Sequence, residues 1–263
     1  MYPSATLAVW TSAWLHGVAA SDDVLDALAA WAEMHEVVAD DDGTATMLEL
    51  PTATERAAQP ALLLGALRRV GTEGAWLVLP TPGDVRGLGG PGPFASEALR
   101  VGHGVVLPEP GLGLVPETVA DGVIRWTVFD VPSKPHIPEL SLGDAEHGLT
   151  TALRDAAGAL TTLDLANHRP GVRDEIKARA ASAHRARWPD GMPPRSLRVL
   201  QRANDVAAIL DVANEDEPGG ALSASAAHRR AEALRPLSHA VRTARCAALD
   251  EAVRVLSDHA DRH

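Results

Sequence analysis

Apolar residues recur every three or four positions from Asp144 to the C-terminus. This spacing places apolar side chains on one face of an α-helix, so it predicts helical structure throughout the region. Breaks rich in Pro, Gly or acidic residues divide it into four helices with short connections, which is typical of a bundle or of a helical layer on a sheet. The positions expected to face the core include Leu149, Leu153, Leu160, Ile176, Leu197, Leu200, Leu210, Leu234, Leu237, Val241 and Leu256.

The first 140 residues mix helical and strand patterns. An amphipathic helix is expected over 4–17, capped by Ser4, and the pattern predicts further helices over 21–32, 60–71 and 94–100. The apolar runs at 75–80, 104–108 and 122–132 predict strands. Residues 36–50 predict a hairpin with Asp42-Gly43 at its turn, and 109–117 is interpreted as a glycine-bearing loop.

These patterns predict an α+β fold, with an N-terminal mixed sheet of roughly five or six strands and several helices. An all-helical, bundle-like C-terminal region should follow. The Pro-rich stretch 133–144 marks the change, and we expect an acidic α+β region over 1–140 and a helical region over 141–263.

Charge is distributed unevenly along the chain. Residues 1–168 contain 22 acidic and 8 basic residues, whereas residues 169–263 contain 13 acidic and 16 basic residues. This asymmetry favours two regions with different contacts, although acidic helices packed beside basic ones would also account for it.

Features at the N-terminus and the cysteine count favour a cytoplasmic protein. The apolar stretch that begins the chain lacks the Lys or Arg that precedes a secretory signal. No apolar run approaches the ~18 residues that a membrane span needs. Cys246 is the one cysteine, so no internal disulfide is expected, and its helical setting favours a packing role.

One loop carries the spacing G-x-G-x-x-G, at Gly87, Gly89 and Gly92. In dinucleotide-binding proteins this motif follows a strand directly and opens a helix whose N-terminus holds the phosphates. Here six residues separate the strand from Gly87, and Pro91 and Pro93 remove two backbone N–H donors. We therefore interpret the loop as structural, with a less specific anion or substrate loop as the alternative.

If a small-molecule site exists, it should lie between the two glycine-rich loops, 81–94 and 109–117. Loops at strand ends are frequent positions for such sites. The candidate polar groups there are Asp84, Arg86 and Glu109.

A second candidate surface is rich in arginine. Arg195, Arg198 and Arg202 share one face of a predicted helix, and Arg185, Arg187 and Trp188 precede it. Such a face could bind nucleic acid, but acidic residues interleave and the net charge of −11 opposes approach to phosphates. A protein interface suits the Arg and Trp content better.

The acidic and histidine clusters predict no metal site. Asp144 and His147 could share an ion, with His136 and His168 nearby, but Asp144 suits a helix N-cap and no third ligand is evident. Asp40, Asp41 and Asp42 are typical of a solvated turn.

From the sequence we favour a cytoplasmic protein without catalytic activity or cofactor that acts through contacts with a protein partner. The alternatives are an enzyme or binder of phosphate ligands that uses loops 81–94 and 109–117, and a nucleic-acid accessory protein that uses the arginine face 185–202. A homo-oligomer stays open, and no membrane partner is expected.

Overall fold

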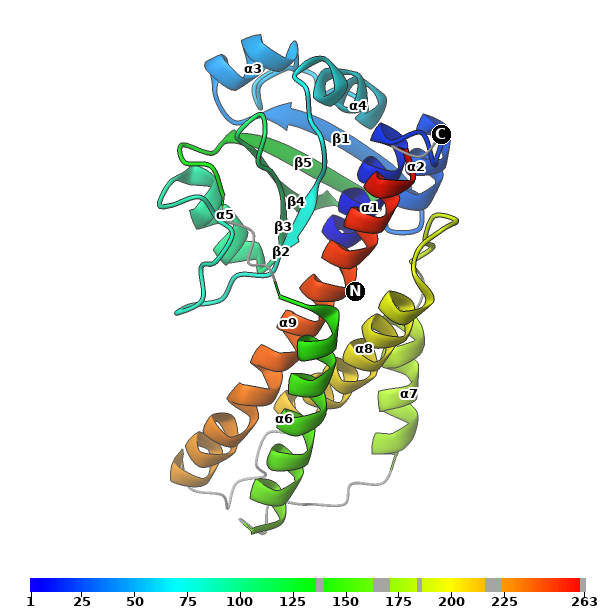
Figure 1. Ribbon diagram of the computed structural model, residues 1–263. Helices are drawn as coiled ribbons and strands as arrows, with labels where there is room; N and C mark the ends of the chain where they lie inside the picture. Colours follow the sequence, from blue (N-terminus) through cyan, green and yellow to red (C-terminus); the bar gives the residue numbers. More distant parts are fainter. Residues whose placement is uncertain (136–139, 163–170, 184–185, 216–223, 261–263) are drawn as a thin grey trace. The chain divides into compact units, whose positions relative to one another are not determined.

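The computed structural model describes residues 1–135, 140–162, 171–183, 186–215 and 224–260 (Figure 1). The chain forms two compact units. Unit 1 consists of Met1–Glu139, Ala186–Pro193 and Leu249–His263, whereas unit 2 consists of Leu140–Arg185 and Pro194–Ala248. The chain therefore crosses between the units four times. The expected division into two domains at residue 140 stays a prediction.

The predicted fold class is confirmed, since a mixed sheet with helices precedes a helical C-terminal region. Helix α9 (Ala224–Ala260) continues past Ala248, so its last part belongs to unit 1. None of the described helices is long and apolar enough to cross a membrane. The elements are α1 (Pro3–Leu15), α2 (Ser21–Leu28), β1 (Met34–Ala39), α3 (Asp42–Leu48), α4 (Pro60–Arg69), β2 (Trp76–Val78), α5 (Pro93–Val101), β3 (Gly104–Leu107), β4 (Leu112–Ala120), β5 (Val123–Asp130), α6 (Leu142–Thr162), α7 (Val172–Ala183), α8 (Pro194–Glu215) and α9 (Ala224–Ala260).

The five strands lie in the order β1-β5-β4-β3-β2. Only β1 and β5 pair in parallel among these neighbours, and the other pairs are antiparallel. The outer edge of β1 is partly covered by the chain itself, because the amides of Val37 and Ala39 donate to the carbonyls of Ala58 and Pro51 over 2.8 Å each. That cover blocks the edge against pairing with another strand.

The two faces of the sheet have separate cores. On one face, Trp126 and Leu114 pack with residues of α1, α2, α3 and α4. On the other face, the smaller core is built around Phe94 of α5 and Phe129 of β5. A Cβ atom at Gly113 would lie only 2.3 Å from the Phe94 ring, so this glycine lets α5 approach the sheet.

Helix α1 is buried on nearly all sides, so the expectation of an amphipathic helix was wrong. Four of its polar side chains are buried as well, and three of them bond to neighbouring elements, whereas Thr11 Oγ1 has no hydrogen-bond partner within the described residues. Ser12 Oγ accepts from the Ala75 amide at 3.0 Å, and Thr6 Oγ1 accepts from Trp31 Nε1 at 2.9 Å. Ser4 does not cap the helix, because Tyr2 holds that position and Ser4 Oγ bonds His103 Nδ1 at 2.9 Å.

Two local predictions in unit 1 were wrong. Residues 42–48 form α3 rather than the second strand of a hairpin, because the Asp41 carboxylate accepts from the amides of Gly43 and Thr44 and so begins a helix. Residues 112–117 belong to strand β4, so the second glycine-rich loop is reduced to the turn before Leu112.

The largest buried side chain, Trp126, is held by a short hydrogen-bond chain. Trp126 Nε1 donates to His35 Nδ1 at 3.1 Å, and His35 Nε2 donates to the carbonyl of Leu28 at 2.8 Å. Burial lowers the pKa of His35, so the ring keeps the neutral form that this chain requires. The chain links β5, β1 and the end of α2.

Acid is expected to destabilise the fold through His103. Burial, assisted by the N-terminal amine, lowers the pKa of His103 to about 4 from 6.5, so between these values the unfolded chain binds the proton more readily. The contribution of His103 to the free energy of unfolding should therefore fall by about 1.4 kcal/mol per pH unit as the pH drops below the unfolded value. Urea unfolding of the wild type and of His103→Gln would measure it. The stability of the wild type relative to the variant should decrease toward acid, and parallel pH profiles would contradict the assignment.

Candidate functional site

The polar candidates of the first glycine-rich loop bind each other. The backbones of Thr81 and Asp84 exchange hydrogen bonds of 3.0 and 2.8 Å, which closes a tight turn. The Asp84 carboxylate then accepts from Arg86 Nε at 2.7 Å and from Arg86 Nη2 at 2.9 Å. This two-point ion pair neutralises the guanidinium that an anionic ligand would need.

The glycines of this loop serve the packing of the chain itself. Gly87 and Gly89 have φ values of +82° and +69°, which favour glycine. A Cβ atom at Gly89 would lie 2.3 Å from a methyl group of Val131 and 2.5 Å from the carbonyl oxygen of Ser133. The space above Gly89 is thus filled by residues 131–133, where a phosphate cradle would need it open. Gly92 is extended, and it precedes α5 as its N-cap residue.

Glu109 lies in the turn that joins β3 to β4. Its Oε2 atom is buried and has no hydrogen-bond partner within the described residues. The amide of Val131 donates to the carbonyl of Gly111 in this turn at 2.8 Å, and Val131 also touches Gly89. The structure therefore brings both loops to one segment, but within the described chain no hydrogen bond or ion pair joins Glu109 to Asp84 or Arg86.

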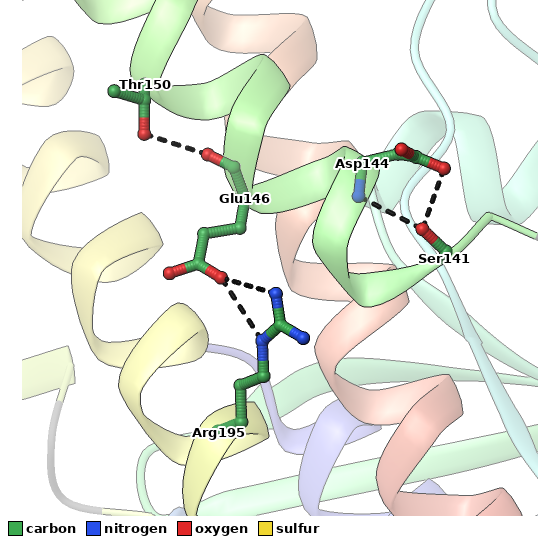
Figure 2. Close-up of polar contacts among 5 residues, drawn as sticks. All are labelled: Ser141, Asp144, Glu146, Thr150 and Arg195. Carbon is green, nitrogen blue, oxygen red and sulfur yellow. Dashed lines mark hydrogen bonds and ion pairs between the residues drawn. The ribbon is translucent and has the colours of Figure 1, made fainter.

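The structure separates the predicted arginines of α8 into two kinds. Figure 2 shows that Arg195 donates to Glu146 of α6, with distances of 3.2 and 3.0 Å from Nε and Nη2 to Oε2. Its charge is thereby balanced within unit 2. Arg198 and Arg202 lie one turn apart on α8, and both side chains are exposed.

The preceding candidates lie in a different unit. Arg187 and Trp188 belong to the segment Ala186–Pro193 of unit 1, where the Arg187 carbonyl accepts from Trp10 Nε1 at 2.9 Å. Arg187 is exposed and Trp188 is partly buried. Arg185 lies outside the described residues.

Asp144, one of the hypothetical metal ligands near α6, binds the residue that caps this helix. Ser141 rather than Asp144 caps this helix, since Ser141 Oγ accepts from the Asp144 amide at 3.0 Å and donates to Asp144 Oδ2 at 2.7 Å (Figure 2). His136 and His168 lie outside the described residues. Within the described part of the chain, no three His, Cys, Asp or Glu side chains are grouped as metal ligands would be.

Sequence reasoning missed one unusual carboxyl group, that of Asp250 in the last part of α9. Burial raises its pKa to about 8, and its Oδ1 atom has no hydrogen-bond partner among the described residues. The carboxyl group is thus largely protonated near neutral pH, a state that can donate a hydrogen bond. Ala247 and Val253, one turn away on either side, are apolar and buried. An acidic residue between apolar residues at helical spacing is the sequence signal that could have pointed to Asp250.

The mixed sheet, the helices and the two compact units define the class as a two-unit α+β protein. Comparison with known proteins places it further: residues 4–140 match the N-terminal domain and residues 143–246 the C-terminal domain of the Rv1486c-like proteins. The chain belongs to this family.

Similar proteins occur in mycobacteria. The uncharacterized protein Rv1486c of Mycobacterium tuberculosis (strain H37Rv) is 38% identical, with 94% of this chain and 96% of that protein covered. The uncharacterized protein ML1804 of Mycobacterium leprae is 35% identical over the same shares of the two chains. No solved structure matches the chain.

A packing role for Gly89 predicts that Gly89→Ala destabilises the protein in the absence of any ligand. The added methyl group would meet Val131 and Ser133, so we expect a loss of about 2–4 kcal/mol in the free energy of unfolding, measured in urea. Gly90→Ala is the matched control, because its φ of +99° is also strained but nothing lies within 4 Å of the added atom. Equal losses in the two variants would refute the packing role.

The buried carboxyl group of Asp250 predicts that Asp250→Asn stabilises the protein increasingly as the pH rises. Because the pKa of Asp250 is about 8 in the folded chain, against an ordinary value of 3.8 for this carboxyl group, the folded chain holds the proton more firmly, and stability is lost as the pH rises between these values. The variant cannot ionise, so its stability relative to the wild type should increase by about 1.4 kcal/mol per pH unit over this window. Thermal melting at pH 5 and pH 8 would measure the slope. A difference that is constant with pH would show that this carboxyl group is not perturbed.

Proposed function

We propose that the protein acts through protein–protein contacts in the cytoplasm and that the exposed face of α8 is a contact surface. The observation that supports this proposal is the stripe formed by Arg198, Arg202 and Ile209, which recur at helical spacing along one side of α8. Ile209 is 43% exposed, so the stripe presents an apolar side chain in line with the two guanidinium groups.

The two arginines of this stripe differ from Arg195 on the same helix. Arg195 is held by Glu146, whereas Arg198 and Arg202 have no hydrogen-bond or ion-pair partner within the described residues. Unpaired guanidinium groups can form two-point contacts with carboxylates, and arginine is enriched at the centres of protein interfaces. A partner that presents carboxylates beside an apolar side chain therefore suits the stripe.

The two other functions considered from the sequence receive less support. A phosphate-binding role for loop 81–94 conflicts with the filled space above Gly89 and with the Asp84–Arg86 ion pair. Nucleic-acid binding would use the same two arginines of α8, so the experiment has to separate the two kinds of partner.

A photo-crosslinking amino acid at Gln201, which is exposed beside the stripe, tests the proposal in the native bacterium. We expect a protein adduct that decreases at least about tenfold when Arg198→Glu and Arg202→Glu are combined, since charge reversal opposes an acidic partner. The same crosslinker at Asp26, exposed on α2, is the positional control.

Each other outcome has a distinct meaning. An adduct that nuclease removes would support the nucleic-acid alternative, and a chain crosslinked to itself would identify a homo-oligomer. If the Gln201 adduct is unaffected by the charge reversal, the stripe on α8 is not the contact surface.

A further inference from the structure

Part of the sheet in unit 1 is exposed on the face opposite Trp126. Side chains alternate between the two faces of a strand, so Met34 and Glu36 of β1 and Val123 and Arg125 of β5 point away from the Trp126 core. Helix α5 packs mainly on β4, and it leaves this end of β1 and β5 accessible. We call Met34, Glu36, Val123, Arg125 and Glu117 of β4 the open sheet face.

A row of charged side chains crosses the open sheet face. The register places Glu36, Arg125 and Glu117 side by side on β1, β5 and β4. Arg125 Nε donates to Glu36 Oε1 at 2.6 Å, and Arg100 of α5 donates to Glu117 Oε1 at 2.8 Å. Arg100 also binds Glu97 Oε2 at 2.7 Å, so α5 adds a third carboxylate at the border of the face.

Each of these three carboxylates still has an oxygen atom to offer. Glu36 and Glu117 use Oε1, and Glu97 uses Oε2, in the ion pairs above, and no partner for the second oxygen occurs within the described residues. Partial burial, together with the carboxylates of Asp41 and Glu97, raises the pKa of Asp40, which places a further acid close to this border. The three carboxylates of Glu36, Glu97 and Glu117 thus share only the two guanidinium groups of Arg100 and Arg125 in these ion pairs.

An apolar row lies beside the charged row. Met34 is paired in register with Val123, and Met34 is 58% exposed. Val119, in the bulge at the end of β4, is 40% exposed. Glu33 approaches Gly122 in the adjoining turn, so an acidic residue also flanks this apolar row.

We infer that the open sheet face is a docking site for a basic amphipathic peptide segment of a protein partner. Lysine or arginine side chains of that segment bind the second oxygens of Glu36, Glu97 and Glu117, and an apolar side chain packs on Met34 and Val123. The charge of the surrounding chain favours such a partner, because Met1–Glu139 holds 18 acidic and 7 basic residues. The site belongs to unit 1 and the stripe on α8 to unit 2, so either proposal can fail alone.

The four methionines of the chain allow a direct test by NMR of methionine methyl groups. The probe is a synthetic peptide, acetyl-Lys-Lys-Leu-Lys-Leu-Lys-Lys-amide, and a peptide with Glu in place of Lys is its control. We expect the Met34 methyl signal to shift and saturate with the basic peptide only. Met47, which is 45% exposed on α3, and buried Met192 should not shift.

Paired charge removals then test the carboxylates. Combining Glu36→Gln with Glu117→Gln should weaken the response of Met34 about tenfold or more. The matched control combines Asp22→Asn with Asp26→Asn, two exposed positions on α2, and should weaken it less than about twofold. The Met192 signal reports in the same spectra whether each variant is folded, and Glu117→Gln alone serves if the double variant is not.

The inference is overturned if Met34 does not respond, or if Met47 responds as strongly, because the probe would then bind without regard to this face. It is equally overturned if the two charge-removal pairs weaken binding alike, since net charge alone would then account for the affinity.

Discussion

Unit 1 depends on one constraint, the burial of a helix that carries polar side chains on several sides. A buried hydroxyl group without a partner costs free energy, so most of those in α1 are bonded to the element packed against the helix. Within the described residues, Thr11 Oγ1 is the exception. In α1, Ser12 meets this requirement through the chain before β2, Thr6 through Trp31 after α2, and Ser4 through His103 before β3. The same bonds that satisfy the helix therefore fix where three other segments lie.

The periodicity of apolar residues was a sound guide wherever an element buries one face. The four C-terminal helices were expected, and the strands β2, β3 and β5 were expected close to their observed bounds. The pattern failed at α1, because a helix buried on all sides shows no polar face. It failed also at Asp41, because an Asp-Gly pair suits both a hairpin turn and the start of a helix, and only the bond to Thr44 decides between them.

The candidate sites were less predictable because their chemistry depends on contacts distant in sequence. The motif at Gly87, Gly89 and Gly92 could be counted from the sequence, but the segment 131–133 that fills its space could not. Arg195, Arg198 and Arg202 look alike in sequence, and only the position of Glu146 on α6 separates the first from the others (Figure 2). The row of Glu36, Arg125 and Glu117 exists through strand register alone, so no spacing along the chain reveals it.

The four crossings of the chain between its units have a consequence for synthesis. Unit 1 includes both the first helix of the chain and the segment that begins at Leu249. During synthesis a segment can pack only after it has left the ribosome, and N-terminal parts generally fold first. The cores described on the two faces of the sheet contain no residue of the segment that begins at Leu249, so they can form before that segment is made. The last segment of unit 1 therefore joins a sheet and helices that have already packed, and unit 1 is completed only when synthesis ends.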